Sequence, residues 1–149
     1  MVSIIIPSYK DPLLFKTIDS LLDNCEGEIE IIPVLDGYVP LQQFKDDDRI
    51  KPVYLESNVG MRGAINAGVE ASKGEFIMRV DEHQVFGKGY DVILAQTCKE
   101  NWIVSPRRYF LDTVKWEVMD IPPVDYCDLV ICGKDKSRKF SGSENKQVT

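Results

Sequence analysis

Asp81 and His83 are the two residues best placed to do chemistry, because they directly follow the mostly apolar run 76–80. A carboxylate and an imidazole two residues apart can bind one divalent ion, and mixed oxygen and nitrogen ligation suits manganese better than calcium. Such an ion would neutralise a diphosphate leaving group. Taken alone, so short a motif is better explained as a solvated acidic turn with a chance histidine. Its position at the end of a predicted buried strand reverses that preference.

Other side chains could bind a nucleotide. Asp36 could accept hydrogen bonds from a base or a ribose, although an Asp before Gly is most often only a turn residue. Tyr9 could stack on a base or simply lie half-buried at a rim. Residues 58–63 combine backbone N–H groups at a helix start with Arg62, which suits a phosphate, although a capped helix needs no ligand. Arg79 is a further cationic candidate, more simply explained as a surface charge.

The elements that must position these residues alternate between strand and helix through the first hundred residues. Strands are predicted at 2–7, 30–35, 50–55 and 75–80, with helices beginning after Asp11, Asn58 and Gly89. This order predicts an α/β fold, with a mainly parallel sheet and helices on both faces. Ligands bind such sheets at the carboxyl ends of the strands. Three clusters should therefore meet at one edge: Pro7-Ser8-Tyr9, Asp36-Gly37 and Asp81-Glu82-His83.

Shorter strands are predicted at 102–105, 113–118 and 128–132, so that residues 1–132 would form one domain. The alternation within 113–118 would place Val114, Trp116 and Val118 on one side of a half-exposed strand. From residue 133 to 149 the chain has little to bury. We expect this polar tail to be disordered.

Composition limits the class of protein. The chain has 149 residues, of which 44% are apolar and 28% charged, as in a soluble globular domain. The formal net charge of −6 argues against nucleic acid or an anionic membrane surface as the main partner. A phosphate ligand would need help from a metal ion or from backbone N–H groups. No apolar run approaches the roughly 20 residues of a membrane span, and no secretion signal is visible. The four cysteines suit reduced thiols. We therefore expect a cytoplasmic protein.

Four motifs, in the expected order, resemble those of the family 2 glycosyltransferases, which have the A-type glycosyltransferase fold. They are the opening strand at residues 2–9, the turn at 34–37, the two Asn-x-Gly motifs within 58–68, and the Gly-Glu strand with its metal motif at 73–83. The resemblance covers residues 1 to about 105. Four ordered motifs are far more specific than any one of them.

The resemblance implies a Rossmann-like sugar transferase that uses a nucleotide diphosphate sugar, most often a uridine diphosphate (UDP) sugar, with Mn²⁺ or Mg²⁺. The acceptor would be a glycan, a lipid or a protein. By position, Tyr9 would lie against the base, Asp36 would bond it, and Asp81 and His83 would hold the metal. The implied nucleotide-sugar-binding residues are Pro7, Ser8, Tyr9, Asp36, Asn58, Gly60, Arg62 and Asp81.

Two substitutions depart from the family pattern. Leu35 replaces the first Asp of the usual Asp-Asp-Gly turn, and His83 replaces the second Asp of the metal motif. An Asp-x-His motif is familiar from the polypeptide N-acetylgalactosaminyltransferases, which retain configuration, whereas family 2 enzymes invert it. The motif therefore leaves the stereochemistry open.

Relatives continue into an acceptor-binding half that carries a carboxylate base in inverting enzymes. The expectation is that this chain is truncated after the donor-binding half, with Glu117 and Asp120 as weak candidates for the base. The alternative is a truncated, inactive nucleotide-sugar-binding module. A nucleotidyltransferase is less well supported, because it would need a glycine-rich basic loop where residues 8–11 read Ser-Tyr-Lys-Asp.

Overall fold

The computed structural model describes residues 1–123, 126–131 and 140–146. The chain divides into two compact units, Met1–Trp102 and Ile103–Thr149. The first unit ends within the range 1–132 that the sequence predicts as one domain. None of the helices in the described ranges is both long enough and apolar enough to span a membrane.

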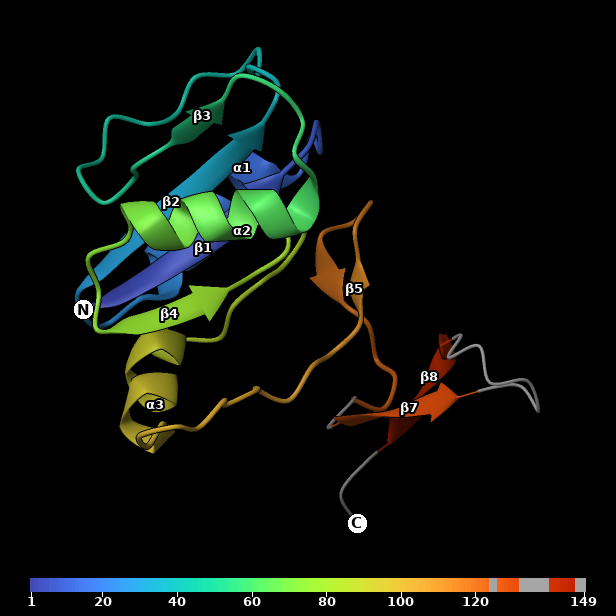
Figure 1. Ribbon diagram of the computed structural model, residues 1–149. Helices are drawn as coiled ribbons and strands as arrows, with labels where there is room; N and C mark the ends of the chain where they lie inside the picture. The colour runs from blue at the N-terminus through green and yellow to red at the C-terminus, as the bar shows by residue number, and fades with distance from the viewer. Residues whose placement is uncertain (124–125, 132–139, 147–149) are drawn as a thin grey trace. The chain divides into compact units, whose positions relative to one another are not determined.

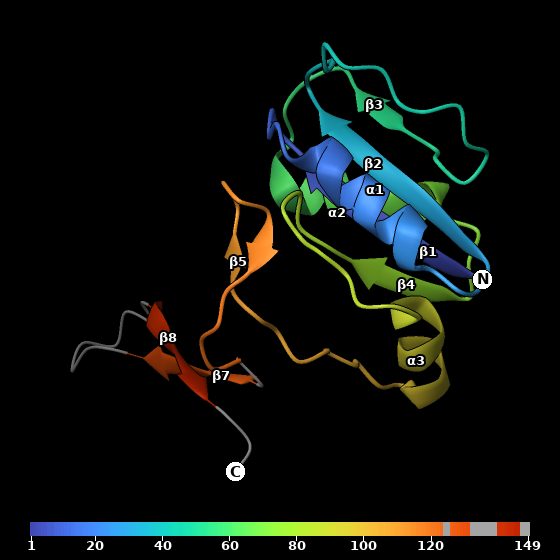
Figure 2. The same ribbon diagram turned by 180° about the vertical axis from the view of Figure 1, so that it is seen from behind.

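The first unit is built on a four-stranded sheet of order β3-β2-β1-β4, in which all neighbouring strands are parallel. On one face of the sheet lies α2 (Figure 1), and on the other lies α1 (Figure 2). The predicted α/β fold, with a mainly parallel sheet and helices on both faces, is confirmed. The strands are β1 (Val2–Ser8), β2 (Ile29–Asp36), β3 (Val53–Leu55) and β4 (Phe76–Arg79), and the helices are α1 (Leu14–Asn24), α2 (Gly60–Ala71) and α3 (Tyr90–Thr97).

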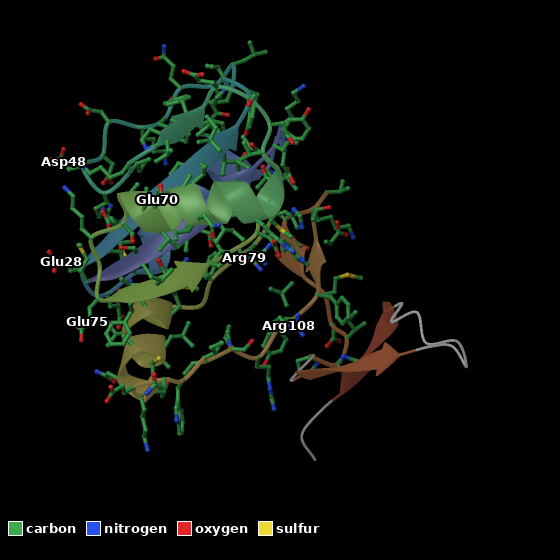
Figure 3. The ribbon with its side chains drawn as sticks, in the orientation of Figure 1. Glu28, Asp48, Glu70, Glu75, Arg79 and Arg108 are labelled. Atoms are coloured by element: carbon green, nitrogen blue, oxygen red, sulfur yellow. The ribbon has the colours of Figure 1, made fainter. Side chains whose placement is uncertain are left out.

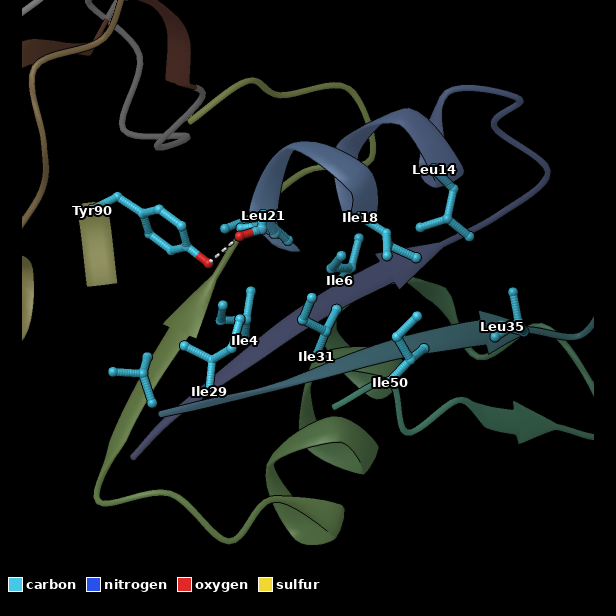
Figure 4. Close-up of a cluster of buried hydrophobic side chains, with 12 residues drawn as sticks. Ile4, Ile6, Leu14, Ile18, Leu21, Ile29, Ile31, Leu35, Ile50 and Tyr90 are labelled. Carbon is cyan, nitrogen blue, oxygen red and sulfur yellow. Dashed lines mark hydrogen bonds between the residues drawn. The ribbon is translucent and has the colours of Figure 1, made fainter. Parts of the chain in front are cut away.

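Both faces of β1 are buried, which explains its three consecutive isoleucines. Ile4 and Ile6 pack with the apolar face of α1, including Ile18 and Leu21, in the cluster shown in Figure 4. Ile5 points to the opposite face and packs under α2 with Ile32, Val34 and Ala64. Two separate apolar layers therefore hold β1 in place and fix the position of its carboxyl end.

Helix α1 begins later than Asp11 and Pro12 suggested. Its first residue is Leu14 and its N-cap is Leu13, without a side-chain capping bond. Asp11 instead accepts a hydrogen bond at Oδ1 from the Leu13 N–H, 2.8 Å away. The Asp-Pro pair therefore shapes the turn before the helix. In such turns an Asp side chain commonly accepts the N–H of the residue two positions later.

Strand β3 is shorter than the strand predicted over residues 50–55. Its ladder to β2 breaks between the bridge at Ile50 and the start of β3 at Val53. Pro33 and Pro52 both lie in this break. Proline has no N–H to donate, and at these positions the ladder between β2 and β3 needs none.

The second unit contains two antiparallel pairs, β5 (Leu111–Asp112) with β6 (Glu117–Val118) and β7 (Tyr126–Ile131) with β8 (Phe140–Lys146). The strand predicted at 102–105 is not formed, and the single strand predicted at 113–118 is wrong. Residues 113–116 form a turn because Asp112 Oδ1 accepts the N–H groups of Val114 and Lys115, each 3.0 Å away.

The polar segment 133–149 was expected to be disordered. Its residues 140–146 form β8, and the other residues of the segment lie outside the described ranges. The strand predicted at 128–132 corresponds to β7, which runs from Tyr126 to Ile131.

Candidate functional site

A pocket of about 270 Å³ opens at the carboxyl ends of β1, β2 and β4. All three polar clusters that the sequence placed at this edge contribute to it. Parallel strands that end together bring such residues together whatever their distance in sequence. The lining residues are Pro7, Ser8, Tyr9, Asp36, Asn58, Gly60, Met61, Ala64, Arg79, Asp81 and Glu82.

Asp36, the last residue of β2, is almost fully buried, and both oxygens of its carboxylate are engaged. Oδ1 accepts the Val59 N–H at 2.7 Å and Oδ2 accepts the Gly60 N–H at 2.9 Å. The side chain therefore caps the start of α2 from another element, where a negative charge is favoured by the helix dipole. This use of Asp36 differs from the expected contact to a base or ribose.

Gly37 explains why the turn after β2 reads Asp-Gly. Its φ is +73°, a conformation that favours glycine, and a Cβ here would collide with the backbone of Ser57 and Asn58. The turn thus lies directly against the segment that enters α2. Close approach of these two backbones is what lets the Asp36 carboxylate reach the first amides of the helix.

Glu82 is a pocket residue that the sequence analysis did not single out. Its Oε1 accepts the backbone N–H of Tyr9 at 2.9 Å, and its carboxylate also bonds the Ser8 side chain. Ser8 is in turn bonded to the Tyr38 hydroxyl. Burial raises the pKa of Glu82, and the hydrogen bonds from Ser8 and Tyr9 oppose that rise. Glu82 thus ties the loop after β4 to the loop after β1.

The only sequence signal for Glu82 was its position between Asp81 and His83. Its backbone adds a link to α1, because its carbonyl accepts the Thr17 hydroxyl at 2.7 Å. Thr17 Oγ1 also accepts the Gln84 N–H at 3.0 Å. The loop that follows β4 is therefore anchored to α1 as well as to β1.

Asp81 and His83 do not meet. Asp81 lines the pocket, where its Oδ1 lies 2.5 Å from Nη2 of Arg79. His83 lies outside the lining, with Nδ1 3.0 Å from Oδ2 of Asp11. The loop turns after β4, so the alternation that would place both side chains on one side does not continue beyond the strand.

Within residues 1–123, no three or more His, Cys, Asp and Glu side chains gather into a metal-binding group. Mg²⁺ and similar ions, however, are usually held by one or two carboxylates together with substrate phosphates. Asp81 is a pocket carboxylate with a side chain 40% exposed. It fits an ion whose other ligands come from a diphosphate and water, whereas the His83 imidazole is paired with Asp11.

The other predicted residues differ in their access to the pocket. Tyr9 is 52% exposed, with its ring edge-on to Tyr38 at 6.2 Å and under the Lys10 ammonium at 5.0 Å. It remains open to a stacking partner. Asn58 lines the pocket, whereas Arg62 is exposed and does not.

Comparison with known proteins agrees with this architecture. The family model described as glycosyl transferase family 2 matches residues 3–138. The chain belongs to this family. The α/β unit with its parallel sheet is consistent with the A-type glycosyltransferase fold.

Individual relatives of this family 2 chain cover only part of it. The uncharacterized glycosyltransferase EpsJ of Bacillus subtilis (strain 168) is 38% identical over 88 residues, which cover 54% of this chain and 25% of EpsJ. The uncharacterized glycosyltransferase alr2836 of Nostoc sp. (strain PCC 7120 / SAG 25.82 / UTEX 2576) is 33% identical over 93 residues, which cover 57% of this chain and 29% of the relative. The similarity thus spans about a quarter to a third of these relatives.

Proposed function

We propose that this family 2 chain binds a nucleotide diphosphate sugar in the pocket and takes part in transferring its sugar to an acceptor. The first candidate donor is a UDP sugar. The observation that carries the proposal is the convergence of an accessible aromatic ring, Tyr9, and a pocket carboxylate, Asp81, at the ends of neighbouring parallel strands. The aromatic ring suits the base of a nucleotide diphosphate, and the carboxylate suits a metal ion bound to its diphosphate.

The base would stack on Tyr9, which is held from two sides. Its backbone N–H bonds Glu82, and its ring lies against Tyr38. A ring fixed in this way gives up little conformational freedom when a base stacks on it. Asp36 would contribute by holding Asn58 and Gly60 in the pocket wall, since its oxygens already bind the amides of Val59 and Gly60.

The charge of the pocket favours a divalent cation. Three carboxylates line it, those of Asp36, Asp81 and Glu82, against the single guanidinium of Arg79. The amides at the start of α2 compensate Asp36, but the remaining charge would still repel a diphosphate. Asp81 would ligate Mn²⁺ or Mg²⁺ through its carboxylate, and His83 would have to release Asp11 to join it.

When bound, such an ion would supply charge stabilisation for the departing nucleoside diphosphate. The sugar would be transferred by displacement at its anomeric carbon, and a base would take the proton of the acceptor hydroxyl. The residues described here would position the donor: the strand ends set the places of Tyr9 and Asp81, and Glu82 locks the two loops together.

Calorimetry with UDP, in Mn²⁺ or in EDTA, tests this proposal. We expect Mn²⁺ to strengthen UDP binding, and Asp81→Asn to remove most of that gain. Tyr9→Ala should weaken binding about 5-fold to 150-fold, the range expected for loss of one base–aromatic stack. Tyr54→Ala is the matched control, because Tyr54 is also 52% exposed but lies in β3, outside the pocket.

Two results would contradict the proposal. One is the absence of UDP binding in either condition, and the other is an equal effect of Tyr9→Ala and Tyr54→Ala. Release of UDP from a UDP sugar, measured with and without candidate acceptors, then separates the transferase from a module that only binds the donor. Acceptor-stimulated release indicates transfer.

A further inference from the structure

Arg79 stands out because, of the eleven lining residues, it alone is positively charged. It is the last residue of β4, where alternate residues are exposed, and Figure 3 shows it beside the start of α2. Its Nη2 lies 2.5 Å from Asp81 Oδ1 and 3.2 Å from Met61 Sδ. The guanidinium therefore bridges the proposed metal-binding carboxylate and the first turn of α2.

The ion pair between Arg79 and Asp81 is exposed enough to be exchanged. The side chains are 41% and 40% exposed, and pairs of this kind contribute little net free energy, because water competes for both charges. A divalent ion at Asp81 would compete with the guanidinium for the same carboxylate. The released guanidinium would present a planar fork of N–H donors that matches phosphate oxygens.

We propose that Arg79 is an exchangeable counter-ion in the pocket, which pairs with Asp81 when the pocket is empty and binds the diphosphate when the donor is present. The inference rests on the proposed donor site and adds the residue that couples ion binding to diphosphate binding. Arg79 gives up Asp81 to the ion and turns to the diphosphate. Its long side chain and half-exposed position allow this exchange without movement of β4.

Removing Arg79 should have two effects of opposite sign. Without nucleotide, Mn²⁺ should bind Asp81 more tightly, because the competing cation is gone. The gain should be roughly two- to fivefold, since an exposed ion pair contributes only that much. With Mn²⁺ present, UDP should bind about tenfold more weakly or worse, because a charged hydrogen-bond donor to the diphosphate is lost.

The experiment compares the full chain with Arg79→Met, Arg79→Lys and Arg49→Met. Free Mn²⁺ is followed by electron paramagnetic resonance during titration without nucleotide, and UDP binding is then measured by calorimetry in saturating Mn²⁺. Arg79→Met keeps an unbranched apolar stem beside Met61. Arg49 is the matched control, because it is also paired with an aspartate two residues away, its side chain is likewise 41% exposed, and it lies outside the pocket.

The expected result is tighter Mn²⁺ binding and weaker UDP binding in Arg79→Met, with neither change in Arg49→Met. Arg79→Lys should restore ordinary Mn²⁺ affinity, because a cation is again beside Asp81, but only part of the UDP affinity, because the planar fork is missing. This partial rescue also excludes misfolding as the cause of the losses.

The outcomes separate this inference from the proposed function. If the wild-type chain binds UDP with Mn²⁺ and Arg79→Met leaves both affinities unchanged, the role of Arg79 is overturned and the donor site stands. Weaker Mn²⁺ binding in Arg79→Met would overturn the exchange as well. A wild-type chain that binds neither Mn²⁺ nor UDP would overturn both.

Discussion

Replacing Asp36 by alanine should destabilise the first unit at the junction of β2 and α2. The carboxylate is only 3% exposed and accepts the Val59 and Gly60 amides at 2.7 and 2.9 Å. A hydrogen bond to a charged group contributes about 1.5–3 kcal/mol, and a lost N-cap costs about 0.5–2 kcal/mol. Val59 is 55% exposed, so water can replace part of the loss. We expect a decrease of about 2–4 kcal/mol in the free energy of unfolding.

Thermal unfolding provides the assay. For a chain of this size, about 1 kcal/mol lowers Tm by roughly 2–4 °C, so Asp36→Ala should lower Tm by roughly 5–15 °C. Asp36→Asn keeps one acceptor oxygen and should show about half the effect. Asp48→Ala is the control, because Asp48 is an exposed carboxylate near the start of β3.

Hydrogen exchange tests the local cause. The amides of Val59 and Gly60 should exchange faster in Asp36→Ala, whereas amides in β1 should change only through the loss of global stability. A Tm loss no larger than that of Asp48→Ala, or unchanged exchange at these two amides, would refute the capping role. The variant should also bind UDP more weakly, because Asn58 and Gly60 form part of the pocket wall.

Two further predictions concern stability. In Gly68→Ala the new Cβ would lie 2.5 Å from Ile5 Cγ2, so crowding should outweigh the gain in helix propensity and lower the free energy of unfolding in urea by about 1–2 kcal/mol. Gly87→Ala is the control and should be near neutral, because Gly87 has open space around it. Equal stabilities of the two variants would contradict the close packing at Gly68. Burial alone would raise the pKa of Glu30, but bonds from Ser3 and two backbone N–H groups lower it below 4.5. Because the pKa is lower in the folded state, the stabilisation is present above about pH 4.5 and is lost as the pH falls through the folded pKa. Urea unfolding from pH 3 to 7 should show this loss in the wild type and a smaller pH dependence in Glu30→Gln.

The order of elements in the first unit could be predicted because the apolar content of each strand indicates how far that strand is buried. β1 carries consecutive isoleucines, and only a strand covered on both faces can bury Ile4, Ile5 and Ile6 together. Because helices are predicted between consecutive strands, a parallel sheet is the simplest arrangement of those strands. The covering helices follow from local chemistry plus the geometry of crossover connections, whereas the strand order β3-β2-β1-β4 comes from the structure.

Local patterns were a poorer guide in the second unit. Residues 113–118 have the apolar alternation of a strand, but Asp112 accepts two amides of the following turn and Trp116 adopts a φ of +61°. The resulting hairpin replaces the predicted strand. Alternation over so few residues does not distinguish one strand from two short arms joined by a turn.

In the site, too, one part of the arrangement could be predicted from the sequence and another could not. Convergence of Tyr9, Asp36 and Asp81 was predictable, because parallel strands share a carboxyl edge. The partner of each side chain was not: Asp36 holds the amides of α2, Glu82 holds Tyr9, and His83 turns to Asp11. A strand sets where a chain leaves the sheet, but hydrogen bonds between loops distant in sequence set where each side chain points. Those bonds exist only once the loops are folded against one another.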